Sequence, residues 1–280
     1  MTANRPLNDA EMVAALEWYR AVGVDLAVGE EPVDRFAASQ MARPRQAPPQ
    51  QAAMPAAAAE RPALPPANAA GLNADPSEAR TLAASAQTLE QLQTILNGYD
   101  GCALKLRATQ LVFADGNPQA DIMLIGEAPG SEEDRIGKPF VGRSGQLLDR
   151  MLAAIGLDRT KVYIANTVPW RPPGNRTPTP EEIALCLPFL HRQVELVAPR
   201  IIVTLGGPAM QTVFQTTAGI LKSRGQWREL TVGNHTAQAI ATLHPAYLLR
   251  QPLQKQHAWR DMLSLKRRIA TENLAGPPQS

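Results

Sequence analysis

The chain has 280 residues, of which 44% are hydrophobic, enough for one sizeable packed domain with additional segments. It has no apolar run of about 18 residues and no basic segment followed by an apolar one at its N-terminus, so we expect neither a membrane span nor a secretory signal. Its two cysteines, Cys102 and Cys186, are too few for a disulfide framework, and we expect two reduced thiols in a cytoplasmic protein.

Charge is unevenly distributed along the chain. Residues 1–100 hold 7 Lys/Arg and 12 Asp/Glu, a balance of −5, whereas the remaining residues hold 21 and 14, a balance of +7. The C-terminal part is therefore the part suited to a polyanion. An ordinary solvated surface would also explain so modest an excess.

The first 80 residues are predicted to lie outside the main domain. Residues 8–22 are typical of a short amphipathic helix, opened by Asn8 or Asp9. Residues 37–80 contain no aromatic residue, Ile, Val or Thr, so they cannot bury enough apolar surface to offset their ordering entropy. We therefore expect a helical segment at 1–36, a disordered linker at 37–80, a globular domain at 81–272 and a tail at 273–280.

After residue 120, apolar strand-like runs alternate with amphipathic helix-like stretches. Strands are predicted at residues 121–125, 161–168, 200–205 and 238–243. Because strands separated by helices usually pair in parallel, we predict a three-layer α/β/α sandwich around a four-stranded parallel sheet. The Pro/Ala-rich linker and the short N-terminal helix precede this domain.

The helices carry recognisable start and stop signals. A first helix is predicted over 77–96, closed by Asn97-Gly98, and a second is expected to begin at Ser144 and to stop at Gly156. The sequence Thr179-Pro180-Glu181-Glu182 combines a capping box with proline at the first helical position, which predicts a third. A final helix is expected to carry one apolar side, formed by Trp259, Met262, Leu263 and Ile269.

Ligands of open parallel sheets bind outside the carboxyl ends of the strands. The first predicted strand runs into Glu127, the second ends near Asn166, the third meets Gly206-Gly207-Pro208 and the fourth meets His244-Pro245. Each polar residue has a structural alternative: an acid near a helix terminus, an amide that satisfies a loop, or a hydrogen-bonded structural histidine. Their convergence on one rim nevertheless predicts a site there.

Three loops near this rim carry residues suited to nucleic acid. Phe140 could be a core residue or a platform on which a base stacks. Residues 170–178, WRPPGNRTP, indicate a stiff basic loop suited to phosphates. Leu248 and Leu249 closely follow His244, and because their exposure would be costly, we expect them to be buried in the protein or wedged into a nucleic-acid stack.

In these motifs the chain resembles the family-four uracil-DNA glycosylases. The order and spacing are similar in GEAPG at 126–130 followed by Glu132-Glu133-Asp134, KPFVG at 138–142, Asn166 with RPPGNR at 171–176, and HPAYLLR at 244–250. The resemblance runs from about Cys102 to Ile269 and leaves residues 1–95 outside. It implies a DNA-repair enzyme that flips uracil, or another damaged base, out of single- or double-stranded DNA and hydrolyses the N-glycosidic bond.

The resemblance also implies roles for residues at the rim. Phe140 would stack on the flipped uracil, and Asn166 would pair with its edge as donor and acceptor together. His244 would stabilise the departing anion. Glu127 would orient water and favour an oxocarbenium-like sugar, with Glu133 and Asp134 as competitors for that acidic role.

Further residues are expected to contact the base or the DNA. Ala128 is expected beside the base, and Leu248, Leu249 and Arg250 resemble the loop that fills the hole left by the flipped nucleotide. The other expected DNA contacts are Arg143, Ser144, Arg171, Arg176, Arg224 and Tyr247. We expect the protein to act as a monomer on uracil-containing DNA, without a membrane partner.

The chain departs from the family at the iron–sulfur site. The family normally holds a four-iron, four-sulfur cluster with four cysteines, and this chain has Tyr99 and Trp170 at two of those positions, keeping Cys102 and Cys186. Two thiolates cannot complete the four-cysteine ligation of such a cluster. We therefore predict no cluster, no other metal and no cofactor, with aromatic packing in the cluster's place.

Two other classes of function fit part of these features. A catalytically weak module could bind uracil-containing or abasic DNA and recruit repair partners through the N-terminal helix, and turnover of uracil-containing DNA would separate it from an enzyme. A nucleotide-processing enzyme could use the same rim. The chain has no phosphate loop of the G-x-x-x-x-G-K type, which counts against that class.

Overall fold

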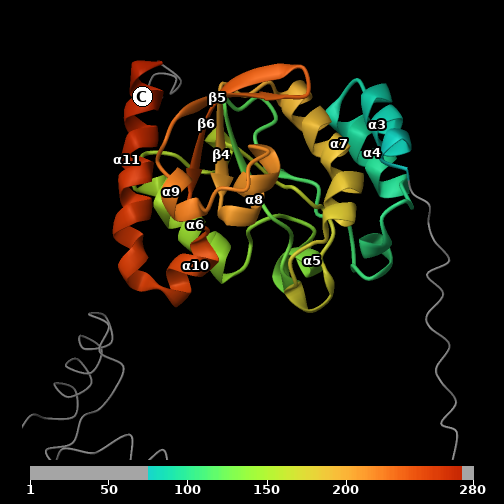
Figure 1. The fold of residues 1–280 in the computed structure, drawn as a ribbon, viewed down its shortest axis with the longest axis horizontal. Helices are drawn as coiled ribbons and strands as arrows, with labels where there is room; N and C mark the ends of the chain where they lie inside the picture. Colours follow the sequence, from blue (N-terminus) through green and yellow to red (C-terminus); the bar gives the residue numbers. More distant parts are fainter. Residues whose placement is uncertain (1–74, 273–280) are drawn as a thin grey trace, which may run out of the picture. The chain divides into compact units, whose positions relative to one another are not determined.

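The computed structural model describes residues 75–272, so the helix predicted at 8–22, most of the predicted linker and the C-terminal tail lie outside the described residues. A six-stranded sheet with the order β1-β3-β2-β4-β6-β5 forms the centre (Figure 1). Its strands are β1 (Asp115–Gly116), β2 (Ile122–Gly126), β3 (Tyr163–Asn166), β4 (Ile201–Leu205), β5 (Arg228–Val232) and β6 (His235–Thr242).

The four predicted strands form the parallel centre of this sheet, but the predicted strand number is wrong. β3, β2, β4 and β6 are parallel neighbours, with Leu124 of β2 registered against Ile164 of β3 and Val203 of β4. Two antiparallel edge strands complete the sheet. β1 has only two residues, and β5 alternates half-buried and exposed positions, so neither produces the continuous apolar run that marks a buried parallel strand.

Helices cover both faces of the sheet, as predicted, and α7 separates the sheet from α3 and α4 (Figure 1). The α-helices are α3 (Pro76–Ser85), α4 (Leu89–Gly98), α5 (Ser131–Ile136), α6 (Arg143–Ala153), α7 (Pro180–Val197), α8 (Gly207–Val213), α9 (Ile220–Ser223), α10 (Pro245–Arg250) and α11 (Lys255–Thr271). Short 3-10 helices are η1 (Ala103–Leu106), η2 (Arg159–Lys161), η3 (Pro173–Asn175) and η4 (Pro252–Gln254). Within residues 75–272, no helix has both the length and the apolar character needed to cross a membrane.

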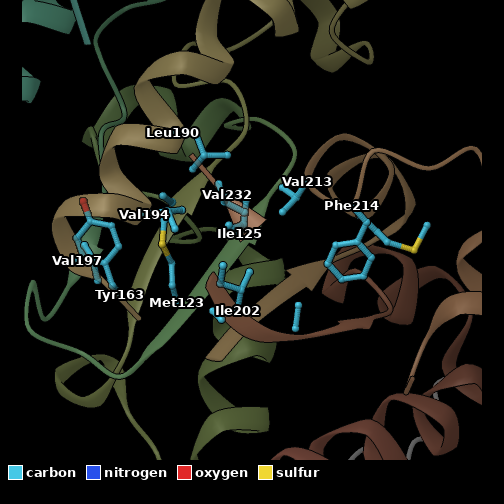
Figure 2. Close-up of a cluster of buried hydrophobic side chains, with 14 of the residues drawn as sticks. Met123, Ile125, Tyr163, Leu190, Val194, Val197, Ile202, Val213, Phe214 and Val232 are labelled. Carbon is cyan, nitrogen blue, oxygen red and sulfur yellow. The ribbon is translucent and has the colours of Figure 1, made fainter. Parts of the chain in front are cut away.

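The two faces of the sheet are buried by alternating residues of the same strands. Met123 and Ile125 of β2 point into a cluster with Leu190 and Val194 of α7 and with residues of α8 (Figure 2). The intervening Ile122 and Leu124 belong to a second cluster, formed with α6 and α11. Because successive strand residues face opposite sides, this alternation fixes the register of the central strands and thereby aligns their carboxyl ends.

One predicted helix is corrected, and the helix that replaces its first part crosses a predicted domain boundary. The single helix expected over 77–96 is divided into α3 and α4, because the Thr88 side chain accepts a hydrogen bond from the backbone N–H of Gln91 and starts a new helix. Helix α3 also crosses the expected domain boundary between Arg80 and Thr81. Its Ala79 and Ala83, one on each side of that boundary, are both buried against the domain, so all of α3 packs as part of it.

The other helix signals give mixed results. The capping box at Thr179 and Glu182 is confirmed at the start of α7. Ser144 does not cap α6, whose N-cap is Gly142. On α11, Met262 and Ile269 are buried as expected, but Trp259 is 44% exposed because the buried side runs instead through Ala258, Asp261 and Leu265.

Candidate active site

A cavity of about 680 Å³ opens at the carboxyl ends of the parallel strands. The segment after β2 contributes Glu127, the segment after β6 contributes His244, and the N-terminus of α8 contributes Gly207. The predicted site residues that line it are Glu127, Ala128, Glu133, Phe140, Ser144, Arg176, His244, Tyr247 and Arg250. The rim predicted from topology is thus where the structure has its larger cavity.

Asn166, at the end of β3, is not among the residues that line the cavity, but it lies across Gly126 from Phe140, which does line it. It is 6% exposed, and its Oδ1 atom has no hydrogen-bond partner within residues 75–272. It is paired in register with Gly126, where a Cβ atom would lie 2.4 Å from Asn166 Oδ1 and 2.7 Å from the Phe140 ring. Glycine is therefore required at 126, because the Asn166 amide and the Phe140 ring leave no room for a Cβ atom, and we call the place where these three residues meet the notch. A buried acceptor without a partner calls for a ligand or a water molecule there.

Phe140 is held in a backbone conformation that is uncommon for an aromatic residue, with φ of 55°. Its carbonyl oxygen lies against α6 at Gly145, where a Cβ atom would approach it to 1.6 Å. The ring is buried and lies with its centroid 5.5 Å from that of the His244 ring, at an interplanar angle of 31°. Phe140 therefore presents an aromatic surface to the cavity, although it also packs in the second core cluster.

His244 is the N-cap of α10, and its Nδ1 accepts a hydrogen bond from the backbone N–H of Ala246 at 3.1 Å. Burial, assisted by the nearby Arg250 cation, lowers the pKa of His244 from 6.5 to about 4. The ring is therefore neutral at neutral pH. Because Nδ1 is an acceptor, the ring proton resides on Nε2, which leaves one N–H donor available.

The three candidate acids are separated by their hydrogen bonds. Glu133 accepts from the backbone N–H groups of Gly130, Val141 and Gly142, so its carboxylate closes the loop that carries Phe140. Asp134 accepts from the backbone N–H and the hydroxyl of Thr109 and is 4% exposed. Both carboxylates are occupied by structural bonds, which leaves the half-buried Glu127 as the acid free to act in the cavity.

Glu127 has an environment that distinguishes it from a surface carboxylate. Burial raises its pKa above the ordinary value, and a hydrogen bond with the Thr177 side chain opposes that rise. Both residues line the cavity. Sequence reasoning missed Thr177, whose place in the basic loop directly after Arg176 was the available signal. Ile220 and Leu221 of the short helix α9 also line the cavity, and they gave no sequence signal.

The five arginines expected to contact DNA fall into two groups: Arg224 alone, and the remaining four. Arg250 is exposed and lines the cavity, Arg143 is exposed at the start of α6, and Arg171 lies in the same loop as Arg176. Arg176 pairs with Glu182 at 2.6 Å, and the Arg171 Nε donates to Asn175 at 2.7 Å.

Arg224 is placed differently. Its side chain is 15% exposed and forms an ion pair with the buried Asp261, and it also donates to the backbone carbonyl of His257. These bonds tie the segment after α9 to α11. We therefore correct the expectation for Arg224: its guanidinium is engaged within the protein, and its structural bonds leave little of it to meet a phosphate.

Of the two alternatives for the leucines after His244, the structure shows burial in the protein. Leu248 is 1% exposed and packs with Leu147, Leu243 and Ala258, and Leu249 is half-buried against the same cluster. Leu248 would have to leave the core to fill a gap in DNA, so its expected DNA contact stays a prediction that requires a change of conformation. Leu249 and Arg250 remain nearer the surface.

A separate cluster lies between α7 and the α3–α4 layer, and we call it the thiol–aromatic cluster. It consists of Tyr99, Cys102, Trp170, Cys186 and Phe189, all at least 96% buried. The two thiol sulfurs are 3.8 Å apart, and the Tyr99 and Phe189 rings are 5.2 Å apart. With only two thiols and with aromatic rings in the intervening volume, these residues do not fit a four-cysteine iron–sulfur cluster. No chemical step is assigned to this region.

Comparison with known proteins identifies the family of the domain that holds this cavity. The family described as the uracil DNA glycosylase superfamily matches residues 113–263. A type-4 uracil-DNA glycosylase of Thermotoga maritima is 46% identical over 150 residues, covering 53% of this chain and 77% of the relative. That of Archaeoglobus fulgidus is 44% identical over 157 residues, covering 54% and 78%.

A third relative covers more of the fold. The type-4 uracil-DNA glycosylase of Pyrobaculum aerophilum is 34% identical over 178 residues, covering 62% of this chain and 91% of the relative. The segment that matches the family, residues 113–263, contains all of the parallel strands and every cavity-lining residue. On its fold, its rim and these similarities, the chain belongs to the uracil DNA glycosylase superfamily.

Proposed function

We propose that this protein excises uracil from DNA. The observation that carries the proposal is the pair of side chains at the notch: the Asn166 amide and the Phe140 ring meet beside Gly126, and the buried Asn166 Oδ1 lacks a partner among the described residues. An amide offers a donor and an acceptor to the edge of a pyrimidine, and a ring offers it a stacking surface. The relatives named as uracil-DNA glycosylases support this substrate class.

The target base must leave the helical stack to enter this notch. Atoms of a paired base cannot be reached inside a duplex, so the nucleotide is extruded into the cavity, at an unstacking cost that is smaller in single strands. Exposed Arg143 and Arg250 would meet the phosphates on either side. The catalytic unit in this proposal is the domain from Asp75 to Glu272, which contains all of the residues assigned a role here.

The chemistry is the breaking of the bond between C1′ of deoxyribose and N1 of uracil. The electron pair of that bond leaves with uracil, as an anion whose charge spreads onto its carbonyl oxygens. The neutral His244 donates its Nε2 proton as a hydrogen bond to one of those oxygens, in a largely dry site where such a donor is effective. A neutral ring suits this role because it stabilises the anion without first needing a buried positive charge.

Glu127 acts on the sugar side of the broken bond. Its carboxylate orients a water molecule toward C1′, and its negative charge favours the developing oxocarbenium ion. The water oxygen forms the new bond to C1′, its proton passes to the carboxylate, and the products are uracil and an abasic site. This role requires the ionised carboxylate, so excision is expected to fall as pH falls through the raised pKa of Glu127.

The test replaces the amide that reads the base. In Asn166→Asp a donor becomes an acceptor, so single-turnover excision of uracil should fall and discrimination against cytosine, which carries an amino donor in place of a carbonyl, should weaken. Asn175→Asp is the control, because Asn175 lines the cavity but its Oδ1 accepts a hydrogen bond from Arg171 and is not part of the notch. Wild-type protein that binds uracil-containing DNA without releasing uracil would instead make this chain a DNA-binding module.

A further inference from the structure

The loop that carries Phe140 is bound from outside the cavity by one guanidinium. Arg159, in η2, donates from Nη1 to the Pro139 carbonyl at 3.1 Å and from Nη2 to the Phe140 carbonyl. The same side chain donates to Asp115 at 2.7 Å and to Asp149 at 2.9 Å. Two carboxylates thus fix the guanidinium, and the guanidinium fixes two successive carbonyls of the loop.

These bonds act on a backbone conformation that is unfavourable for phenylalanine. Phe140 has a φ of 55°, a left-handed conformation that a bulky side chain disfavours. Its carbonyl lies between Arg159 on one side and the Cβ-free Gly145 of α6 on the other. The carbonyl carbon and the Cβ atom are both attached to the Phe140 Cα, so bonds that hold the carbonyl also hold the direction of the Cα–Cβ bond from which the ring projects.

We propose that Arg159 is a positioning residue, which sets the Phe140 ring at the distance and angle at which it stacks on the target base. The proposal rests on the function proposed above and adds to it a residue outside the cavity. Asp115 and Asp149 belong to the device because they fix the guanidinium. Lys138, 3.2 Å from Asp115, supports the same carboxylate from the loop itself.

A lysine at position 159 cannot reproduce this arrangement. An ammonium group has three donors on a flexible stem, whereas the guanidinium spreads five donors in a rigid plane. Arg159→Lys keeps the charge near Asp115 but loses the simultaneous bonds to two carboxylates and two carbonyls. The expected result is a ring that is less well placed, with a weaker grip on the base.

The experiment measures the affinity of the full-length protein for free uracil, by titration and by inhibition of single-turnover excision. Arg159→Lys should weaken uracil binding about tenfold, within the contribution of one stacked base. The same substitution in a Phe140→Ala background should weaken it less than about twofold, because the ring through which Arg159 acts is gone. Equal losses in both backgrounds would overturn the proposal.

Arg192→Lys is the matched control for stability. Arg192 is 22% exposed, compared with 24% for Arg159, and it likewise donates to a backbone carbonyl, that of Ala86, and to a carboxylate, that of Glu195. It lies on α7, away from the notch. Both variants should lower the melting temperature, but only Arg159→Lys should weaken uracil binding. An equal loss of affinity in Arg192→Lys would mean that general destabilisation explains the effect.

The outcomes separate this inference from the proposed function. Wild-type protein that excises uracil, together with an Arg159→Lys variant of unchanged affinity, would overturn the role of Arg159 alone. Wild-type protein that neither excises nor binds uracil would overturn both. Where the wild-type protein binds uracil without excising it, the titration alone decides for or against Arg159.

Discussion

The cavity and the thiol–aromatic cluster lie in the same domain, but the cavity is characterised by desolvated polar groups and the cluster by apolar packing. The cluster is mostly apolar and is stabilised by packing, with Trp170 and Phe189 fully buried, although the buried Tyr99 hydroxyl has no hydrogen-bond partner within residues 75–272. The cavity holds a desolvated carboxylate, a neutral buried histidine and an amide oxygen without a partner in residues 75–272, each of which costs stability. The free energy of packing elsewhere in the domain offsets the cost of these polar groups, which are the groups suited to chemistry.

The largest effect expected from this comparison is a loss of stability on substitution in the thiol–aromatic cluster. Trp170→Ala should lower the free energy of unfolding by about 3–5 kcal/mol, because a fully buried aromatic side chain is removed. Excision per folded molecule should stay close to wild type. Denaturant unfolding and single-turnover rates on the same preparations check both statements.

Trp259→Ala is the control for this prediction, since Trp259 is 44% exposed and should cost little. If folded Trp170→Ala protein loses its excision rate, the cluster and the cavity are coupled, and the separation between the two regions fails. Trp170→Phe offers the same comparison should the alanine variant not fold.

The second effect concerns catalysis. His244→Ala should lower the single-turnover rate about 10²–10³-fold, equivalent to about 2.7–4 kcal/mol, while weakening binding to uracil-containing DNA much less. His235→Ala serves as the control, because His235 bonds the Pro199 carbonyl on the edge strand pair, away from the cavity. A rate that falls only in proportion to lost folded protein would make His244 a structural residue.

The third effect is a pH dependence of stability. The pKa of His244 is about 4 in the folded state and 6.5 ordinarily, so the unfolded chain binds the additional proton first as pH falls. The folded state should therefore lose up to about 3 kcal/mol between those two values, and the contribution is fully present above the higher one. Denaturation from pH 7 to pH 4 should show a shallower loss in His244→Asn, and parallel curves for the two proteins would contradict it.

The rim and the central sheet could be predicted because their signals are local. The apolar runs of β2, β3, β4 and β6 mark buried parallel strands, and strand ends then place Glu127, Asn166 and His244 together without knowledge of packing. The features that the sequence left open or missed depend on distant contacts. Burial of Leu248 depends on α6 and α11, and the roles of Arg224 and Arg159 depend on carboxylates far away in sequence.

The fourth effect is small and returns to the cluster. Replacing Cys102 and Cys186 together by Ala should cost about 1 kcal/mol, because each behaves as a small buried hydrophobe. The purified wild-type protein should be colourless and contain no stoichiometric iron, and the variant should match it in visible absorption and excision. Iron in the wild-type protein that is lost in the variant would show that two thiols hold a cluster after all.

The smallest effect concerns the charged rim around the cavity. Arg143→Ala and Arg250→Ala should each weaken DNA binding similarly across sequences and flatten its salt dependence by up to about one unit, because each removes one phosphate contact and the counterions that the contact releases. Arg200→Ala is the control: Arg200 is 53% exposed but precedes β4, at the edge of the sheet opposite the cavity. Binding isotherms at several salt concentrations measure these slopes. A flatter slope for Arg200→Ala with unchanged slopes for the other two variants would place the DNA on the opposite edge, and the cavity would no longer be the site that DNA approaches.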